Sequence, residues 1–262
     1  MEANIERTRW YDRVWAAFIF FTRLPFWRLH EPPQACYRTV VEHWPLTGWL
    51  TGGVAAVTLW LATQYLPYAL AVLLAIVMRL LLTGALHEDG LADFLDGFGG
   101  GGTDRTRILT IMKDSHIGTF GVLGLILYEL MLAAALFSLD PMVAACAIWA
   151  ADPYAKMLTA PLVAVMPYAR REEEAKAKVI YRKMSWWAAV SLLIQGLLPM
   201  GVFIWLTNIY WGWLLIVPCL VMCGLSLHIW RRLRGYTGDC CGAVCLLVEL
   251  ATLLVIVAET VW

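Results

Sequence analysis

The hydrophobic residues of this chain fall into long continuous runs separated by shorter polar segments. A membrane-spanning helix needs about 20 apolar residues, and seven segments approach or reach this length. They are Leu46–Ala62, Ala69–Leu86, Phe120–Phe137, Val143–Val165, Trp186–Leu206, Tyr210–Ile229 and Gly242–Ala258. This pattern predicts an all-α, polytopic helical membrane protein with about seven transmembrane helices.

A shorter apolar run, Val14–Phe21, precedes the first predicted span. Arginines lie before it, and Thr-Arg-Leu-Pro follows it at residues 22–25, where a cleavable signal peptide would carry small residues. We predict an N-terminal interfacial or partly inserted helix, because Arg23 and Pro25 limit how deep this run can lie.

The composition agrees with a membrane protein. Of the 262 residues, 61% are hydrophobic and 15% are charged, whereas soluble domains carry about 45–50% and about 25%. No change in composition separates a second domain, so residues 1–262 are predicted to form a single integral membrane domain. The formal net charge is zero and indicates no particular partner; no nucleic acid is expected.

Lysine and arginine concentrate in four segments, which are residues 1–45, His87–Thr119, Pro167–Ser185 and Trp230–Cys241. The intervening connections Thr63–Tyr68, Ser138–Met142 and Thr207–Ile209 are short and carry none. The positive-inside rule places the four basic segments in the cytoplasm. We therefore expect a multi-pass protein of the bacterial cytoplasmic (inner) membrane, with its active face in the cytoplasm.

The stretch from His87 to Gly97 is the most informative one. It places four carboxylates directly after the second apolar run, those of Glu88, Asp89, Asp93 and Asp96. On a helix that extends this span, the three aspartates share a face roughly 60° wide. Like charges so placed repel one another unless a cation lies among them, and a hard divalent cation suits oxygen ligands. The alternative is a solvated helix start, where acids favour the helix dipole.

The rest of the segment adds a glycine run and positive charge. Gly99–Gly102 would let backbone N–H groups approach a phosphate, although a flexible linker looks the same. Arg105, Arg107 and Lys113 follow. A pyrophosphate substrate would suit this segment, because the cationic side chains can bind its phosphates and the carboxylates can bind magnesium. Residues 87–119 are therefore the predicted cytoplasmic catalytic loop.

Two motifs in this loop carry a family resemblance. Thr83-Gly84-Ala85-Leu86-His87-Glu88-Asp89-Gly90-Leu91-Ala92-Asp93, with Asp96-Gly97 after it, and Ile111-Met112-Lys113-Asp114-Ser115-His116-Ile117-Gly118-Thr119-Phe120-Gly121 resemble the two signatures of the cobalamin synthase family, the adenosylcobinamide-GDP ribazoletransferases. Weaker matches are Phe21–Pro25, Pro167–Arg170, Thr237–Asp239, Gly242-Ala243 and Glu249. The matches run in order along nearly the whole chain. Family members commonly have Arg where His116 stands.

The resemblance implies the late nucleotide-loop assembly step of cobalamin biosynthesis. Adenosylcobinamide-GDP and α-ribazole, or α-ribazole 5′-phosphate, give adenosylcobalamin, or its 5′-phosphate, and GMP. The expected partners are these substrates and membrane lipid. A homo-oligomer or a complex with other cobalamin-assembly enzymes is compatible with the family resemblance. The expected enzyme is a Mg²⁺-dependent phosphotransferase.

Each polar residue of the loop then has an expected role. The predicted Mg²⁺ ligands are Glu88, Asp89, Asp93 and Asp96. The catalytic carboxylates are Asp89, Asp93, Asp96 and Asp114, of which Asp96 or Asp114 is favoured to accept the proton of the ribazole hydroxyl. The predicted substrate-binding residues are His87, Arg105, Arg107, Lys113, Ser115 and Asp239.

Ionisable residues inside predicted spans are functional candidates by default. For Asp152 and Lys156 we favour a structural ion pair, because they are four residues apart on a helix. Arg79 could neutralise an acid or reach a phosphate, and Glu249 could complete the site with Asp239. We interpret the run from Arg170 to Glu174 as a mixed-charge surface loop.

Two other functions remain open from the residues. A CDP-alcohol-type phosphotransferase with a lipid acceptor would use the same metal site. A cation-coupled transporter would need carboxylates near the bilayer midplane and often an inverted repeat. The acids lie at the end of a span and no repeat is apparent, so transport is the less favoured of the two.

Overall fold

The computed structural model describes residues 8–170 and 184–261. Within these ranges the elements are α1 (Trp10–Phe21), η1 (Phe26–Arg28), η2 (Gln34–His43), α2 (Trp44–Ala62), α3 (Tyr68–Thr83), α4 (Leu86–Gly100), α5 (Arg105–Ile111), α6 (Thr119–Phe137), α7 (Pro141–Thr159), α8 (Leu162–Val165), α9 (Trp186–Thr207), α10 (Trp211–Leu233) and α11 (Gly238–Val261). No strand forms in the described ranges. The predicted all-α fold is confirmed.

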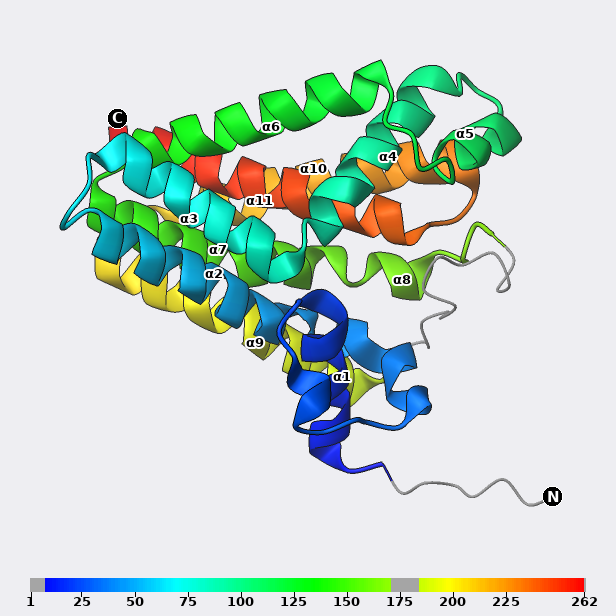
Figure 1. The fold of residues 1–262 in the computed structure, drawn as a ribbon, viewed down its shortest axis with the longest axis horizontal. Coiled ribbons are helices and arrows are strands. Elements are labelled where there is room, and N and C mark those ends of the chain that lie inside the picture. The colour runs from blue at the N-terminus through cyan, green and yellow to red at the C-terminus, as the bar shows by residue number, and fades with distance from the viewer. Residues whose placement is uncertain (1–7, 171–183, 262) are drawn as a thin grey trace.

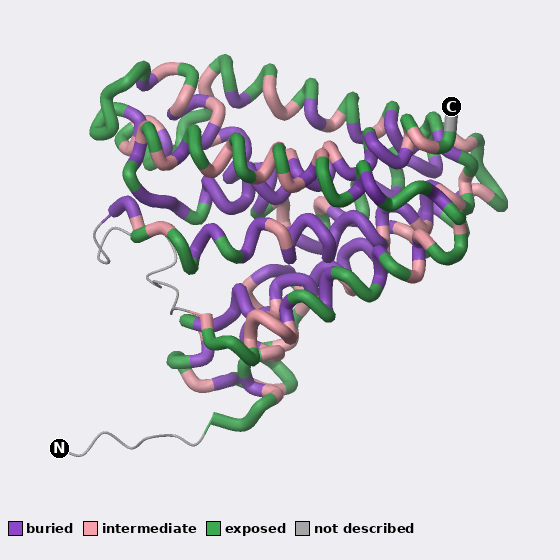
Figure 2. Tube along the Cα trace, turned by 180° about the vertical axis from the view of Figure 1, so that it is seen from behind, coloured by how far each residue is buried: buried purple, intermediate pink, exposed green. Residues whose placement is uncertain are grey.

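The long helices lie side by side in a bundle (Figure 1). Helix α7 packs against α2, α9 and α11, and α11 also packs against α4 and α10. The buried positions follow these inner helices (Figure 2). The outer helices expose large apolar side chains. An apolar outer surface of this kind suits a lipid environment.

Five helical segments of the described residues are long and apolar enough to cross a membrane, and a bent pair, α3 with α4, would make six. The predicted span Val143–Val165 is not among them. Its helix α7 ends at Thr159 and carries Asp152 and Lys156, and most of its residues are buried. The structure therefore makes this predicted span an inner helix of the bundle, enclosed by its neighbours.

The sequence suggested that the acidic stretch extends the second span in a straight line, but the structure shows a sharp bend. Helices α3 and α4 meet at 89°. The chain turns at Gly84 and Ala85, whose φ angles are 65° and 54°, and glycine is common at such a helix end. The backbone N–H of Arg23 donates to the Leu82 carbonyl (2.8 Å) and its side chain fills the space beside Gly84. The Phe21–Pro25 motif thus supports the bend.

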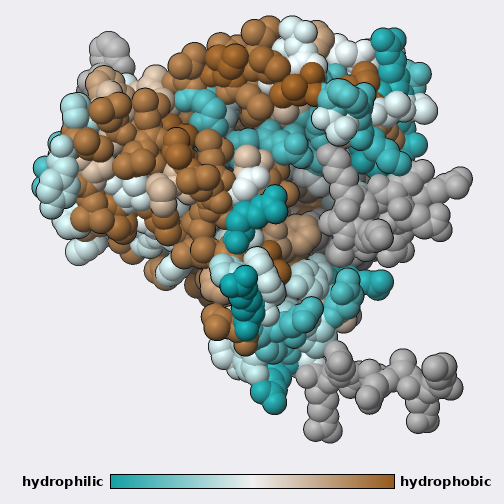
Figure 3. Space-filling view, viewed as in Figure 1, coloured by the Kyte–Doolittle hydropathy of each residue, from teal (hydrophilic) through white to brown (hydrophobic). Residues whose placement is uncertain are grey.

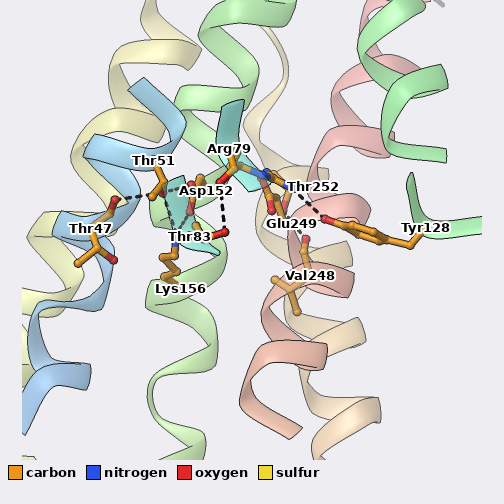
Figure 4. Close-up of polar contacts among 10 residues, drawn as sticks. All are labelled: Thr47, Thr51, Arg79, Thr83, Tyr128, Asp152, Lys156, Val248, Glu249 and Thr252. Atoms are coloured by element: carbon orange, nitrogen blue, oxygen red, sulfur yellow. Dashed lines mark hydrogen bonds and ion pairs between the residues drawn. The ribbon is translucent and has the colours of Figure 1, made fainter. Parts of the chain in front are cut away.

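Charged residues inside the bundle pair with one another (Figure 4). Arg79 donates to Glu249 (2.5 Å) and to the Tyr128 hydroxyl (3.2 Å). Lys156 pairs with Asp152 and donates to the Thr51 hydroxyl, which itself donates to Asp152 (2.5 Å). The predicted Asp152–Lys156 pair is confirmed. We call these six residues the interior cluster.

One end of the bundle carries α4 and α5. It also carries the connection from α5 to the start of α6, residues 166–170 after α8 and residues 234–237 after α10. Hydrophilic residues gather at this end, whereas apolar ones cover the flank of the bundle (Figure 3). We refer to it as the polar end. The C-terminus lies at the opposite end (Figure 1).

Candidate functional site at the polar end

The four predicted metal ligands all lie on α4, but they face different surroundings. Asp89 is exposed, Asp93 is half-buried, and Glu88 and Asp96 are buried. The helix period explains only part of the division: Glu88 is rotated by about 100° from Asp89, whereas Asp93 lies one turn further along the same face. Asp96 lies on that face too, but the start of α6 covers it. Only Asp89 and Asp93 remain together towards the outside of the polar end.

Glu88 and His87 face into the bundle. They line a small cavity together with Arg79, Asp152, Lys156 and Glu249. Glu88 Oε2 and His87 Nε2 are buried and have no hydrogen-bond partner among the described residues. The His87 ring lies parallel to the rings of Trp44 and Phe21, with centroids 5.6 and 6.2 Å away. The structure therefore separates His87 from the other predicted substrate-binding residues.

The Asp96 carboxylate holds the two loop signatures together. Its oxygens accept the backbone N–H groups of Gly118 (2.7 Å) and Gly121 (2.8 Å), at the start of α6. A carboxylate in this position is also favoured by the α6 dipole. Since both oxygens are engaged by backbone donors, Asp96 fixes the connection from Met112 to Gly118 relative to α4.

Asp239 joins α4 to the other motifs. It lies in the first turn of α11, and a Cβ placed on Gly90 would lie 3.1 Å from the Asp239 Cα, so the two backbones nearly touch. Oδ2 of Asp239 lies 4.0 Å from Nη2 of Arg170. The segments holding Arg170 and Asp239 are linked by the paired backbones of Tyr168 and Tyr236. These contacts bring motifs from distant parts of the sequence to one place.

A pocket of about 980 Å³ lies between α5 and residues 168–170. We call it the α5 pocket, and its lining includes Arg105, Lys113, Asp114, Tyr168 and Arg170. Arg105 also holds the pocket together, because Nε donates to the Leu233 carbonyl and Nη2 to the Ala169 carbonyl, both at 2.7 Å.

Two predicted substrate-binding residues, Arg107 and Ser115, are exposed and fall outside the pocket as the described residues outline it. The interpretation of the run from Arg170 to Glu174 as a surface loop is wrong for Arg170, because its side chain is only 3% exposed. The rest of that run, residues 171–174, lies outside the described residues. Glu249 also differs from expectation: it belongs to the interior cluster and not to the polar end.

Asp114 and His116 form an exposed pair at the rim of the α5 pocket. His116 Nδ1 lies 2.7 Å from Asp114 Oδ1, and the His116 backbone N–H donates to the same oxygen (3.0 Å). These hydrogen bonds, led by the one from the ring, lower the pKa of Asp114. The carboxylate is therefore held in its ionised, proton-accepting form.

The arrangement of the carboxylates on α4 decides which of them could bind a metal ion. Among the described residues, no three His, Cys, Asp or Glu side chains are grouped for a metal ion. Mg²⁺ commonly binds through one or two carboxylates, with substrate phosphates and water completing its shell. Asp89 and Asp93, one turn apart on α4, meet that requirement, whereas Glu88 and Asp96 are directed elsewhere.

The comparison with known proteins identifies the family. The model of the cobalamin-5-phosphate synthase family matches residues 13–257. This chain belongs to that family. Similar proteins named adenosylcobinamide-GDP ribazoletransferase occur in Leptothrix cholodnii, at 37% identity over 91% of this chain and 92% of the relative. One in Shewanella baltica OS155 is 35% identical over 96% and 97%, and one in Shewanella frigidimarina is 35% identical over 98% of both chains.

No solved structure matches this chain. The cobalamin-5-phosphate synthase motifs quoted from the sequence can nevertheless be placed. The two loop signatures meet at the polar end with two further motifs, Pro167–Arg170 and Thr237–Asp239. The Phe21–Pro25 motif supports the bend before α4. Sequence reasoning missed Tyr168 and Arg170 as pocket residues, although the Pro-Tyr-Ala-Arg match already marked them.

Proposed function

We propose that this chain joins adenosylcobinamide-GDP to α-ribazole or α-ribazole 5′-phosphate, giving adenosylcobalamin or its 5′-phosphate and GMP. The observation that carries the proposal is the family match over residues 13–257. It is supported by the meeting of four separate motifs around Asp89, Asp93, Asp239 and the α5 pocket. No feature of the site favours a lipid acceptor or ion transport.

The reaction forms one P–O bond and breaks another. A hydroxyl oxygen of the ribazole attacks the cobinamide-linked phosphorus of adenosylcobinamide-GDP, and the bond from that phosphorus to the oxygen of GMP breaks. The hydroxyl proton passes to a carboxylate, and GMP leaves with the bonding electron pair. Such a transfer depends mainly on positioning and on stabilising negative charge.

The residues of the polar end divide this work. Asp89 and Asp93 would hold Mg²⁺, which supplies charge neutralisation to the diphosphate and the departing GMP. Asp114 is the better acceptor for the hydroxyl proton, because Asp96 accepts two backbone N–H groups while Asp114 lies exposed at the pocket rim. Lys113 and Arg170 offer positive charge to phosphate oxygens.

We also propose that the polar end faces the cytoplasm of a bacterial inner membrane. Basic residues that follow the apolar helices gather there, among them Arg105, Arg107, Lys113, Arg231 and Arg234. The positive-inside rule assigns such segments to the cytoplasm. Water-soluble nucleotide substrates would reach the site from that side, and lipid would surround the apolar outer helices.

The test uses purified protein with adenosylcobinamide-GDP, α-ribazole 5′-phosphate and Mg²⁺, and follows GMP release. We expect release that requires both the acceptor and the divalent ion. Replacing the acceptor by a lipid alcohol should give none. GMP release with the lipid alcohol in place of the ribazole would contradict the proposal.

A further inference from the structure

The α5 pocket has a charge character that differs from that of α4. Three cationic side chains, those of Arg105, Lys113 and Arg170, line it beside the single carboxylate of Asp114. None of the α4 carboxylates is part of its lining as the described residues outline it. A pocket of this kind suits an anionic group that is bound without a metal ion.

Arg170 lies in the wall of this pocket and has a donor without a partner in the described part of the chain. Its side chain is 3% exposed, Nη2 donates to the Leu109 carbonyl (3.3 Å), and the same nitrogen lies 4.0 Å from Asp239. Nε is buried and has no hydrogen-bond partner among the described residues. Because the Arg170 guanidinium has a carboxylate no nearer than 4.0 Å among the described residues, its positive charge reaches the pocket beside it and favours an anion there.

Asp239 separates the pocket from the acids of α4. On one side its backbone packs against Gly90, next to Asp89. On the other side its carboxylate faces Arg170. Asp239 therefore contacts both places. A volume of about 980 Å³ is at the upper end of the range for small-molecule pockets, roughly 300–1,000 Å³.

We propose that the α5 pocket is the subsite for the 5′-phosphate of the ribazole acceptor, with Lys113 and Arg170 as its phosphate-binding residues. This inference rests on the proposed function. The diphosphate of the donor would lie at Asp89 and Asp93, which would hold a metal ion that neutralises its charge. The metal-free cationic pocket then takes the second phosphate, which undergoes no bond change and orients the acceptor hydroxyl towards the donor.

Lys113→Ala is the main test variant, because Lys113 is exposed and its loss should leave the fold intact. With α-ribazole 5′-phosphate we expect the KM of the acceptor to rise about tenfold or more, the effect of losing a charge-assisted hydrogen bond. The KM of unphosphorylated α-ribazole and that of adenosylcobinamide-GDP should stay unchanged. Lys113→Arg should restore most of the loss.

Arg231→Ala is the matched control. It removes a positive charge from an exposed residue in the last turn of α10, at the same end of the bundle but outside the pocket lining. It should alter neither KM. An equal rise for both acceptors in Lys113→Ala would show a general disturbance and overturn the proposal. A rise confined to adenosylcobinamide-GDP would assign the pocket to the donor diphosphate and overturn it as well.

Equilibrium dialysis separates this inference from the proposed function. Without any donor present, the wild-type protein should bind α-ribazole 5′-phosphate about tenfold or more tightly than α-ribazole, and Lys113→Ala should lose that difference. Equal affinities in the wild type would overturn the subsite even if GMP is released. Absence of GMP release with both acceptors would overturn the proposed function while the dialysis still decides the subsite.

Discussion

The interior cluster and the polar end use the same residue types for different purposes. In the interior, Arg79 pairs with Glu249 and Lys156 with Asp152, and all four side chains are at most 5% exposed. At the polar end, Asp89 is exposed on α4, and Lys113 and Asp114 are exposed at the α5 pocket. A buried charge must be paired within the protein, whereas an exposed one can meet a substrate. The paired charges inside this membrane protein therefore hold the fold, and we propose that the exposed ones at its polar end carry the chemistry.

Glu88 and Asp89 show how sharp the boundary is. They are adjacent in the sequence, but Glu88 is buried beside Arg79 and Lys156 while Asp89 faces outward. The turn at Gly84 and Ala85 sets the direction of α4 and with it the side to which each acid points. The comparison predicts that substitutions in the two regions fail in different ways.

The largest effect on activity is expected at the polar end. Replacing Asp93 by Asn removes one of the two carboxylates proposed to hold Mg²⁺, so GMP release should fall by about 10²–10³-fold, the range for losing one charge-stabilising group. The unfolding midpoint should change little, because Asp93 is only half-buried. Asp140→Asn, at the exposed N-cap of α7 at the opposite end, is the matched control and should keep full activity.

The next effect concerns stability in the interior cluster. Arg79→Leu leaves Glu249 buried without its partner and should lower the free energy of unfolding by about 3–5 kcal/mol. The double variant Arg79→Leu with Glu249→Leu should recover most of it, since no charge is then left unpaired. Denaturant unfolding in detergent micelles measures both. If the single and double variants were equally unstable, pairing would not be what Arg79 provides.

A smaller effect is expected at the junction between the two loop signatures. Asp96→Asn puts an N–H₂ group where a backbone N–H of Gly118 or Gly121 now donates, which should cost about 1–3 kcal/mol. Hydrogen exchange of residues 112–121 should become faster. Asp104→Asn is the control: Asp104 caps α5 with its side chain, and Asn caps equally well. Unchanged exchange in Asp96→Asn would argue against this junction.

The smallest effect is a shift in pH dependence. Hydrogen bonds from His116 lower the pKa of Asp114, so the carboxylate stays ionised until the pH falls through that lowered value. His116→Ala removes the ring donor and should raise the pKa of Asp114. If Asp114 accepts the ribazole proton, the acidic limb of the rate profile moves to higher pH. A profile that does not move would assign the proton to another group.

The sequence predicted the helices better than their arrangement. Apolar runs located the long helices, because hydrophobic length is a local property. The bend at Gly84 was missed although glycine at a helix end signals it, and its cause, the packing of Arg23, comes from a distant segment. Helix period alone separates Glu88 from Asp89, but only the packing of α4 shows which of them faces inward.

The α5 pocket could not be derived from spacing. Arg170 appeared to belong to a charged surface run, yet it is buried because the Leu109 carbonyl and Asp239 approach it from two other elements. Asp96 was a candidate metal ligand by spacing, and its contacts with Gly118 and Gly121 depend on where α6 begins. Long-range contacts of this kind leave no periodic trace in a single sequence.

The most direct test of the central claim compares two variants in the same two assays. Asp93→Asn and the double variant Arg79→Leu with Glu249→Leu are each measured for Mg²⁺-dependent GMP release from adenosylcobinamide-GDP and for unfolding in denaturant. We predict that Asp93→Asn loses turnover and keeps its stability. The double variant should keep its turnover within several-fold of the wild type and its free energy of unfolding within about 1–2 kcal/mol. Normal turnover in Asp93→Asn, together with lost turnover in a stable double variant, would contradict the account.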